Sequence, residues 1–350
     1  MTLEAYFDEI YQCVRCGYCQ KAYLNDQYYD VCPYYELFGF ESYSARGKIA
    51  IARAILEGKL EYNISLSDRV FRCLLCGSCI VHCPVNLNIC GIVRAMREES
   101  YQKGFFPSKL KKIVSNIKEK GNIFGYAQNK KTDWSSDLEL PTKENIMYFA
   151  GCFASFVRPE IARATIRIIK NAGIRIGYLG EKERCCGNLL FKSGLTDLAE
   201  KLVKHNVSAL EKAGAEQVVF SCACGFHTFK TEYPRIIGGE LPFKVMHTSQ
   251  MFIDLISKGK IKFKENLDKT VTYHDPCNLG RYEKVYHAPR AIIEKIPKIK
   301  LIELSRNKEN ARCCGGGAGV NRILFPEISR KMASEKIKEA KKAGAKTIIT

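Results

Sequence analysis

The chain has 350 residues, of which 46% are apolar, and its 55 basic and 37 acidic side chains give a formal net charge of +18. This length suggests about two domains, and no apolar run reaches the roughly 20 residues that a membrane-spanning helix requires. The composition therefore argues against a disordered chain and against a transmembrane segment of its own.

The positive charge raises nucleic acid as a partner, but the pattern does not favour it. The lysines are dispersed along expected helices instead of alternating with aromatic residues, which indicates solvated helix faces. Thiolate-bound metal clusters would also lower the net charge. No nucleic-acid partner is expected.

Eight of the 17 cysteines form two runs near the start, each ending in Cys-Pro: Cys13, Cys16, Cys19 and Cys32, then Cys73, Cys76, Cys79 and Cys83. Three cysteines two residues apart can bind three irons of one [4Fe–4S] cube, and a cysteine before proline completes a cube. Zinc uses C-x2-C pairs but has no need of a third cysteine at this interval. Disulfides are the other alternative, but the absence of a signal-like start points to a reducing, cytoplasmic compartment. The spacing predicts two [4Fe–4S] clusters.

In two-cluster ferredoxins, the Cys-Pro of one run completes the cube of the other. One cube is therefore expected on Cys13, Cys16, Cys19 and Cys83, and the other on Cys73, Cys76, Cys79 and Cys32. Cys90 has no partner at ligand spacing and is interpreted as a small buried apolar residue.

A helix is expected between the two runs, with Ser44 as its N-cap and Gly58 as its stop, and a second helix from Ile89 to Tyr101. Residues 1–104 are therefore predicted to form an α-helical two-cluster ferredoxin domain, not the compact β-hairpin type. At the start of the first helix, Arg46 and Lys48 either donate hydrogen bonds to cluster sulfur or are simply solvated.

Residues 105–144 have the composition of a connector, with Pro107, Gly121, Gly125, Pro141 and the single tryptophan, Trp134. After it, β-like runs alternate with helical stretches, which predicts layered α/β units with parallel-type sheets. The strands are expected at 146–150, 217–220, 270–273 and 346–349, and the longer helices at 158–172, 195–213 and 327–343. The whole chain is thus predicted to be α+β and multidomain.

The second half repeats itself. A strand that leads to a cysteine, a Cys-Cys-Gly turn, a long helix and an Ala-Gly-Ala turn occur twice, with offsets of 125 residues at the first cysteine and 130 at the last turn. Two domains are therefore expected, at 145–262 and 263–350. The second ends two residues before the expected counterpart of Cys222, so it is expected to be incomplete at its C-terminus.

The remaining cysteines of the repeats follow expected strands or the turns between them. The first unit has five, namely Cys152, Cys185, Cys186, Cys222 and Cys224, and the second has Cys277, Cys313 and Cys314. Because the carboxyl ends of parallel strands share one edge of a sheet, the cysteines of each unit are expected to meet there. Five thiolates exceed the needs of zinc or of one ordinary cube.

Two further motifs accompany the second unit. His274 and Asp275 either deliver protons to a substrate or form a turn in which Asp275 caps the backbone. The glycine-rich stretch from Gly315 to Gly319 lacks the lysine and serine of a phosphate loop, so close backbone approach to a cluster explains it better.

The pattern of Cys152, Cys185-Cys186-Gly187 and Cys222-x-Cys224 resembles the CCG domain, which occurs in heterodisulfide reductases and in iron–sulfur subunits that oxidise lactate, glycolate and glycerol-3-phosphate. Together with His274-Asp-Pro-Cys277-Asn278 and Cys313-Cys314-Gly, it is most similar to the D-type subunits of the heterodisulfide reductase family. The resemblance implies one or two further iron–sulfur clusters in the CCG domains, of the non-cubane [4Fe–4S] type. This chain has C-x-C where the family has C-x2-C, and Asn278 where relatives often have histidine.

The resemblance implies a cytoplasmic iron–sulfur oxidoreductase that is peripheral on the inner face of the membrane only through a partner. Its cluster cysteines would pass electrons to the catalytic set Cys152, Cys185, Cys186, Cys222 and Cys224, which would reduce a thiol disulfide. The alternative is a relay from a flavoprotein dehydrogenase to a quinone pool. The expected partner is a membrane cytochrome b-type subunit or that dehydrogenase. A zinc-bearing nucleic-acid protein is the third hypothesis, suggested by charge alone.

Overall fold

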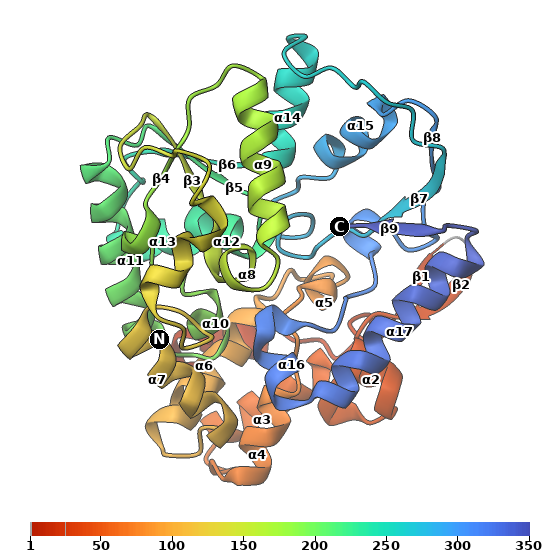
Figure 1. The fold of residues 1–350 in the computed structure, drawn as a ribbon. Coiled ribbons are helices and arrows are strands. Elements are labelled where there is room, and N and C mark those ends of the chain that lie inside the picture. The colour runs from red at the N-terminus through yellow and green to blue at the C-terminus, as the bar shows by residue number, and fades with distance from the viewer. Residues whose placement is uncertain (1, 25) are drawn as a thin grey trace.

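The computed structural model describes residues 2–24 and 26–350. Its N-terminal part is a set of short helices arranged around the two cysteine runs (Figure 1). They are η1 (Leu3–Tyr6), α1 (Phe7–Tyr11), α2 (Pro33–Phe38), η2 (Glu41–Tyr43), α3 (Ala45–Leu56), α4 (Ile64–Phe71), α5 (Ser78–Val81) and α6 (Ile89–Gln102). The helical domain predicted from the sequence is therefore present.

Two of these helices begin at the caps that their sequences supply. The Ser44 side chain accepts a hydrogen bond from the backbone N–H of Gly47 at 3.2 Å, and the Asn88 side chain does the same for Gly91 at 2.9 Å. An N-cap satisfies amide groups that the first helical turn leaves without a partner. The helices that carry Lys48 and Cys90 thus begin where the sequence predicts.

A short antiparallel hairpin, β1 (Lys21–Leu24) and β2 (Gln27–Asp30), fills the gap between Cys19 and Cys32. The sequence analysis did not predict it. Its cross-strand pair Tyr23 and Tyr28 has ring centroids 5.0 Å apart, and both rings are exposed. Because a hairpin returns the chain to its starting point, it accommodates the long gap and still brings Cys32 back to the cysteine pockets.

The stretch interpreted as a connector also has structure of its own. It contains α7 (Ser108–Lys120) and the 3₁₀ segment η3 (Gln128–Ser135). Leu110, Val114 and Ile117 are buried on one face of α7, which is the spacing of an amphipathic helix. Polar residues between these apolar positions give this segment the overall composition of a linker.

The first repeat is a four-stranded sheet with the order β4-β3-β5-β6, in which all neighbouring pairs are parallel. Its strands are β3 (Ile146–Phe149), β4 (Gly177–Tyr178), β5 (Gln217–Phe220) and β6 (Lys244–His247). Its helices are α8 (Gly151–Phe156), α9 (Pro159–Asn171), η4 (Gly180–Lys182), α10 (Asn188–Lys192), α11 (Thr196–Lys212), α12 (Ala223–His227), η5 (Thr228–Glu232), α13 (Tyr233–Ile237) and α14 (Thr248–Ser257). The order of strands and helices was predictable from the sequence, but no residue range was predicted for the strands β4 and β6.

The second repeat is a parallel three-stranded sheet with the order β8-β7-β9. Its strands are β7 (Lys269–Tyr273), β8 (Ile299–Leu301) and β9 (Thr347–Ile349). Its helices are α15 (His287–Lys295), η6 (Lys308–Asn310), η7 (Gly317–Gly319), α16 (Val320–Leu324) and α17 (Pro326–Lys342). The two predicted parallel-type sheets are thus both present.

The three parts pack against one another. Figure 1 shows both sheets in the upper half of the molecule, with the orange N-terminal helices below and the blue α16 and α17 beside them. One apolar cluster joins Tyr34, Leu74 and Cys76 of the N-terminal part to Cys313 and Met332 of the second repeat. The second cysteine run is therefore covered by segments that are distant in sequence.

In the described part of the chain, no helix has both the length and the apolar character needed to cross a membrane.

Candidate functional site

The first cysteine pocket lies at the surface of the N-terminal part. It is lined by the sulfur-bearing residues Cys13, Cys16, Cys19 and Cys83, together with Arg15 and Arg46. Cys16 is exposed and the other three are half-buried. The Arg46 guanidinium binds the Glu41 carboxylate through two hydrogen bonds, at 2.6 and 2.8 Å. The structure thus groups three cysteines of the first run with the Cys-Pro of the second.

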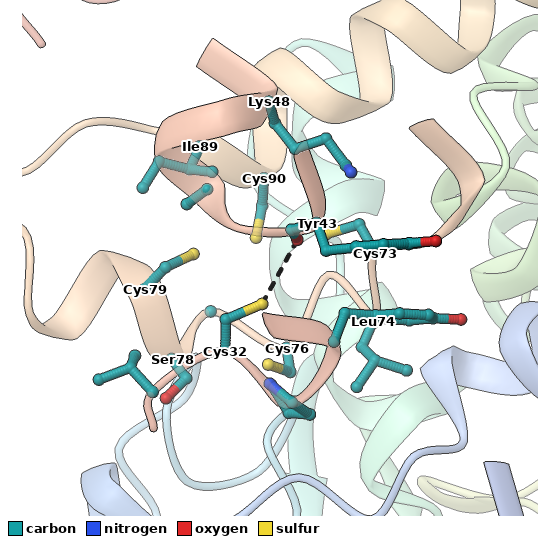
Figure 2. Close-up of a pocket in the computed structure, with 15 residues that line it drawn as sticks. Cys32, Tyr43, Lys48, Cys73, Leu74, Cys76, Ser78, Cys79, Ile89 and Cys90 are labelled. Carbon is teal, nitrogen blue, oxygen red and sulfur yellow. Dashed lines mark hydrogen bonds between the residues drawn. The ribbon is translucent and has the colours of Figure 1, made fainter. Parts of the chain in front are cut away.

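The second cysteine pocket lies deeper. Cys32, Cys73, Cys76 and Cys79 line it, again three cysteines of one run with the Cys-Pro of the other. Figure 2 shows the sulfurs of Cys32, Cys76 and Cys79 around a common space, with Tyr43 and Leu74 closing one side. The Cys32 thiol donates a hydrogen bond to the Tyr43 carbonyl at 3.5 Å. Burial is the main reason why the pKa of Cys32 rises to about 12.

Cys90 is a fifth cysteine in the second cysteine pocket. It is buried, as predicted, but its sulfur faces the same space as the other four (Figure 2). The Tyr282 hydroxyl donates a hydrogen bond to this sulfur at 3.2 Å. The place of Cys90 in this pocket was not predicted, because Cys90 lies on α6, outside both cysteine motifs. The only signal in the sequence was its position in the first turn of the helix expected after Cys83-Pro84.

The donor set of both pockets suits an iron–sulfur cluster. Among the described residues, neither pocket is lined by histidine, aspartate or glutamate, so cysteine sulfur supplies every strong metal ligand. In the same part of the chain, no three histidine, cysteine, aspartate or glutamate side chains are arranged to hold a single metal ion. A [4Fe–4S] cube does not require several side chains around one ion, because each of its four thiolates binds a different iron.

In the first repeat, Cys152, Cys185 and Cys186 form one group at the carboxyl edge of the sheet. Cys152 follows β3, and the Cys185 thiol lies beside it and beside Cys186. The neighbouring Cys185 thiol, together with burial, raises the pKa of Cys152 well above its usual range. These three predicted site residues are therefore brought together.

A buried ion pair holds the loop in front of Cys152. Lys131 Nζ lies 3.0 Å from the Glu183 carboxylate, and both side chains are completely buried. Glu183 also accepts hydrogen bonds from the backbone N–H groups of Ala150 and Gly151, at 2.9 and 3.0 Å. The segment predicted to be a connector thus supplies a charge that positions the first cysteine of the repeat.

Cys222 and Cys224 form a second group, at the start of α12, directly after the neighbouring strand β5. Their thiols lie side by side, and this contact with Cys224 lowers the pKa of Cys222 to about 6. The Asn278 side chain, from the second repeat, donates a hydrogen bond to the Cys224 sulfur at 3.1 Å. The charge of Cys277 also raises the pKa of Cys224. The pair therefore faces the second repeat, although β3 and β5 are adjacent strands of one sheet.

The cysteines of the second repeat meet the second cysteine pocket. The Cys313 thiol lies between Cys76, Cys277 and Cys314. Its hydrogen bond lowers the pKa of Cys76 to about 5, even though burial acts in the opposite direction. This juxtaposition of a ferredoxin-type cysteine with the Cys-Cys-Gly turn was not predictable from spacing within either motif.

His274 and Asp275 have different roles in the structure. Asp275 is buried and binds Arg290 through two hydrogen bonds, at 2.7 and 2.8 Å, and it accepts a third from the backbone N–H of Lys308. This agrees with the structural interpretation of Asp275 as a backbone-binding residue. His274 instead lies beside Cys314.

The glycine-rich stretch packs against the second cysteine run. A Cβ atom at Gly317 would lie 3.5 Å from the Leu74 side chain and only 2.9 Å from that of Asn321, and φ at Gly317 is +56°. Tyr34 donates a hydrogen bond to Asn321, which in turn donates to the Gly315 carbonyl at 2.7 Å. At Gly317 the backbone therefore approaches the loop that carries Cys76 closely, whereas the predicted approach of this stretch to a cluster stays a prediction.

Comparison with known proteins agrees with this architecture. The 4Fe-4S dicluster domain matches residues 9–87, and the cysteine-rich CCG domain matches residues 146–230 and 271–350. The D-type subunit of the dihydromethanophenazine:CoB–CoM heterodisulfide reductase of Methanosarcina barkeri is 35% identical over 96% of this chain and 85% of its own length.

More distant relatives have other functions. An EtfAB:quinone oxidoreductase of Syntrophomonas wolfei is 29% identical over 75% of this chain and 38% of its own length. The B-type subunit of the fumarate reductase (CoM/CoB) of Methanothermobacter marburgensis is 30% identical over 81% of this chain and 55% of its own length.

A dicluster ferredoxin domain followed by two cysteine-rich domains defines an iron–sulfur oxidoreductase. Within that class, the chain belongs to the family of D-type heterodisulfide reductase subunits, as its sequence predicted.

Proposed function

We propose that this chain passes electrons from two [4Fe–4S] clusters to its cysteine-rich domains and there reduces a thiol disulfide. One cluster would be bound by Cys13, Cys16, Cys19 and Cys83, and the other by Cys32, Cys73, Cys76 and Cys79. By similarity to the heterodisulfide reductases of Methanosarcina, the substrate is the heterodisulfide of coenzymes M and B.

The observation that carries this proposal is the contact between Cys76 and Cys313. It brings a ligand of the second ferredoxin-type cluster next to the Cys-Cys-Gly turn of a cysteine-rich domain. Arg281, from the same domain, donates a hydrogen bond to the Cys76 carbonyl at 2.8 Å and fixes this approach. An electron leaving the second pocket therefore has a direct route into the domain.

The reaction consumes two electrons and two protons for each disulfide: the S–S bond breaks and two thiols form. Bound clusters supply the electrons one at a time. The side chains at the cysteine-rich sites would bind the substrate sulfurs and donate protons. His274, which lies beside Cys314, is placed to hold such a proton.

Further clusters in the cysteine-rich domains are part of the proposal. The group Cys152, Cys185 and Cys186 with the pair Cys222 and Cys224 would hold one, and Cys277, Cys313 and Cys314 would contribute to another. The contact from Asn278 to Cys224 supports a shared site between the repeats.

The test uses the full chain, loaded anaerobically with iron and sulfide and reduced by a viologen dye. Turnover of the coenzyme M–coenzyme B heterodisulfide, followed by viologen oxidation, is the expected result. Failure to turn over any thiol disulfide, while electrons from a flavoprotein dehydrogenase are accepted, would establish the relay instead.

The relay alternative has one observation in its favour. Cys224 is shifted by one residue from the family pattern, and its sulfur accepts a hydrogen bond from Asn278 of the other repeat, so the five-cysteine set of the first repeat departs from the family's. A relay would need no complete catalytic set. In either case we expect a partner in a complex, either a membrane cytochrome b-type subunit or a flavoprotein dehydrogenase.

A further inference from the structure

We propose that the second cysteine pocket is the high-potential end of the ferredoxin domain, because four buried cations surround it and, among the described residues, none of them has a carboxylate as its ion-pair partner. This inference rests on the proposed binding of clusters to both pockets. It assigns an internal direction of electron flow, from the first pocket to the second.

The four cations are Lys48, Arg97, Lys192 and Arg281, and they are called the cation ring below. Their exposed fractions are 1%, 1%, 5% and 5%. They come from α3, α6, α10 and the loop after β7, and thus from all three parts of the molecule. Such deep burial of four positive charges is costly unless anions compensate them.

Backbone carbonyls of the second cysteine run accept hydrogen bonds from three members of the ring. Arg97 donates to the Cys73 carbonyl at 2.6 Å, Arg281 to that of Cys76 at 2.8 Å, and Lys192 to that of Leu75 at 3.3 Å. The fourth member, Lys48, lines the pocket and donates to the Ser42 carbonyl at 2.5 Å (Figure 2). One positive charge therefore lies in the pocket, and the other three lie against the backbone of the run that supplies three of its cysteines.

Neutral carbonyls do not cancel these charges. Among the described residues, no carboxylate oxygen is found within ion-pair distance of any member of the ring. Three buried acids, Glu183, Glu232 and Asp275, pair with Lys131, Arg94 and Arg290 instead, and only Glu232 also feels the charge of a ring member, Lys192. Arg97 Nε also has no hydrogen-bond partner in this region. The missing anion is best supplied by four thiolates and their cluster, which carry net negative charge.

The cysteines of the pocket affect the pKa of two members of the ring even without a bound cluster. Burial by itself would lower the pKa of Arg281, but the charges of Cys76, Cys277 and Cys313 outweigh it and raise that pKa. Lys48, by contrast, has its pKa lowered to about 8, mainly by burial, and the charges of Cys73 and Cys32 oppose this shift. These two cations are thus electrostatically coupled to cysteines of the pocket.

The first cysteine pocket has a different charge environment. Its two charged lining residues are Arg15, which is exposed, and Arg46, which is neutralised by Glu41. Reduction adds one negative charge to a cluster, so uncompensated cations nearby stabilise the reduced form. Burial of the second cluster opposes its reduction. The cation ring favours reduction, and its effect is the larger one because its charges act through a medium of low dielectric. The second cluster is therefore reduced at the higher potential.

The test is a redox titration of the fully loaded, full-length chain, followed by electron paramagnetic resonance. Cys16→Ser and Cys79→Ser assign the two signals, since each changes one pocket. We expect the signal of the second pocket to have the higher midpoint potential. The reverse order in the unsubstituted protein would overturn the inference without any need for a ring variant.

Lys48→Met removes one charge of the ring. It should lower the reduction equilibrium constant of the second cluster about tenfold, or about 59 mV for a one-electron couple, and leave the first unchanged. Lys48→Arg retains the charge and should restore the potential, and Lys59→Met removes an exposed charge as a matched control. An unchanged midpoint in Lys48→Met, or an equal shift of both signals, contradicts the inference.

Iron and acid-labile sulfide analysis separates this inference from the proposed function. A chain that binds neither refutes both. A chain that binds both clusters but shows the reverse order of midpoints refutes only the direction of electron flow.

Discussion

At the scale of single residues, the cysteines have two kinds of neighbour. Those within a run are fixed by local spacing, and the cross-over rule for two-cluster ferredoxins predicted that Cys83 joins Cys13 and that Cys32 joins Cys73. Those between motifs depend on tertiary packing. The contact of Cys76 with Cys313 and the presence of Cys90 in the second pocket have no local signature, so they became apparent only in the fold.

The neighbouring pair Cys222 and Cys224 gives a prediction on reactivity. Because Cys224 lowers the pKa of Cys222 to about 6, while the pKa of Cys224 itself is raised well above its usual range, the cluster-free chain should hold one thiolate in this pair at pH 7. Iodoacetamide should modify Cys222 several-fold faster than Cys224, with a rate that rises with pH through about 6 and then levels off. Peptide mass spectrometry checks this. Equal labelling, or a rate that rises only near pH 9, would show that the pair is not coupled.

The buried pair of Lys131 and Glu183 gives a second prediction. Lys131→Met leaves a buried carboxylate without its partner, and such a loss costs about 3–5 kcal/mol. We expect a lower urea midpoint, while Lys130→Met, which changes the exposed lysine next to it, should have almost no effect. Adding Glu183→Gln to Lys131→Met should recover part of the loss. Equal midpoints for the Lys130 and Lys131 variants would mean that the ion pair does not stabilise the fold.

At the scale of helices and strands, the repeat made most of the second half predictable. The periodic helices α9, α11 and α17 and the strands β3, β5, β7 and β9 lie within a few residues of their expected places. The hairpin β1–β2 and the helix α7 were missed for physical reasons. The hairpin strands have only four residues each, and α7 has only three buried apolar positions among many lysines.

The proposed domain boundary between residues 262 and 263 can be tested by limited proteolysis. The loop between α14 and β7 carries the exposed lysines Lys258, Lys260, Lys262 and Lys264. The stretch 105–144 is instead tied down by the buried Lys131 and Trp134. Trypsin should therefore cut first between 258 and 264, giving fragments of about 29 and 10 kDa on a gel. A first cut within 105–144 would mean that this stretch is a flexible connector after all.

At the scale of the whole molecule, the excess of positive charge is not confined to the surface. Part of it is the buried cation ring, which a bound cluster with its thiolates would compensate under the proposal above. The basic composition therefore reflects cofactor binding in addition to solvated helix faces.

Cluster binding should accordingly stabilise the entire fold. A ligand present at about a hundred times its dissociation constant contributes about 2.7 kcal/mol, which for a chain of this size raises the unfolding temperature by roughly 4 °C. Anaerobic calorimetry of the loaded and cluster-free chain measures the difference, with iron added without sulfide as the control. An unchanged unfolding temperature would contradict a structural role for the clusters.

The packing of Gly317 against Leu74 also bears on how the protein is made. A ribosome adds 241 further residues between Cys76 and Gly317, which takes roughly 12–48 s at about 5–20 residues per second. During that interval the nascent loop bearing Cys76 has no cover from the later segment. Iron delivered to this loop before Gly317 is made would therefore meet a second pocket that lacks its cover.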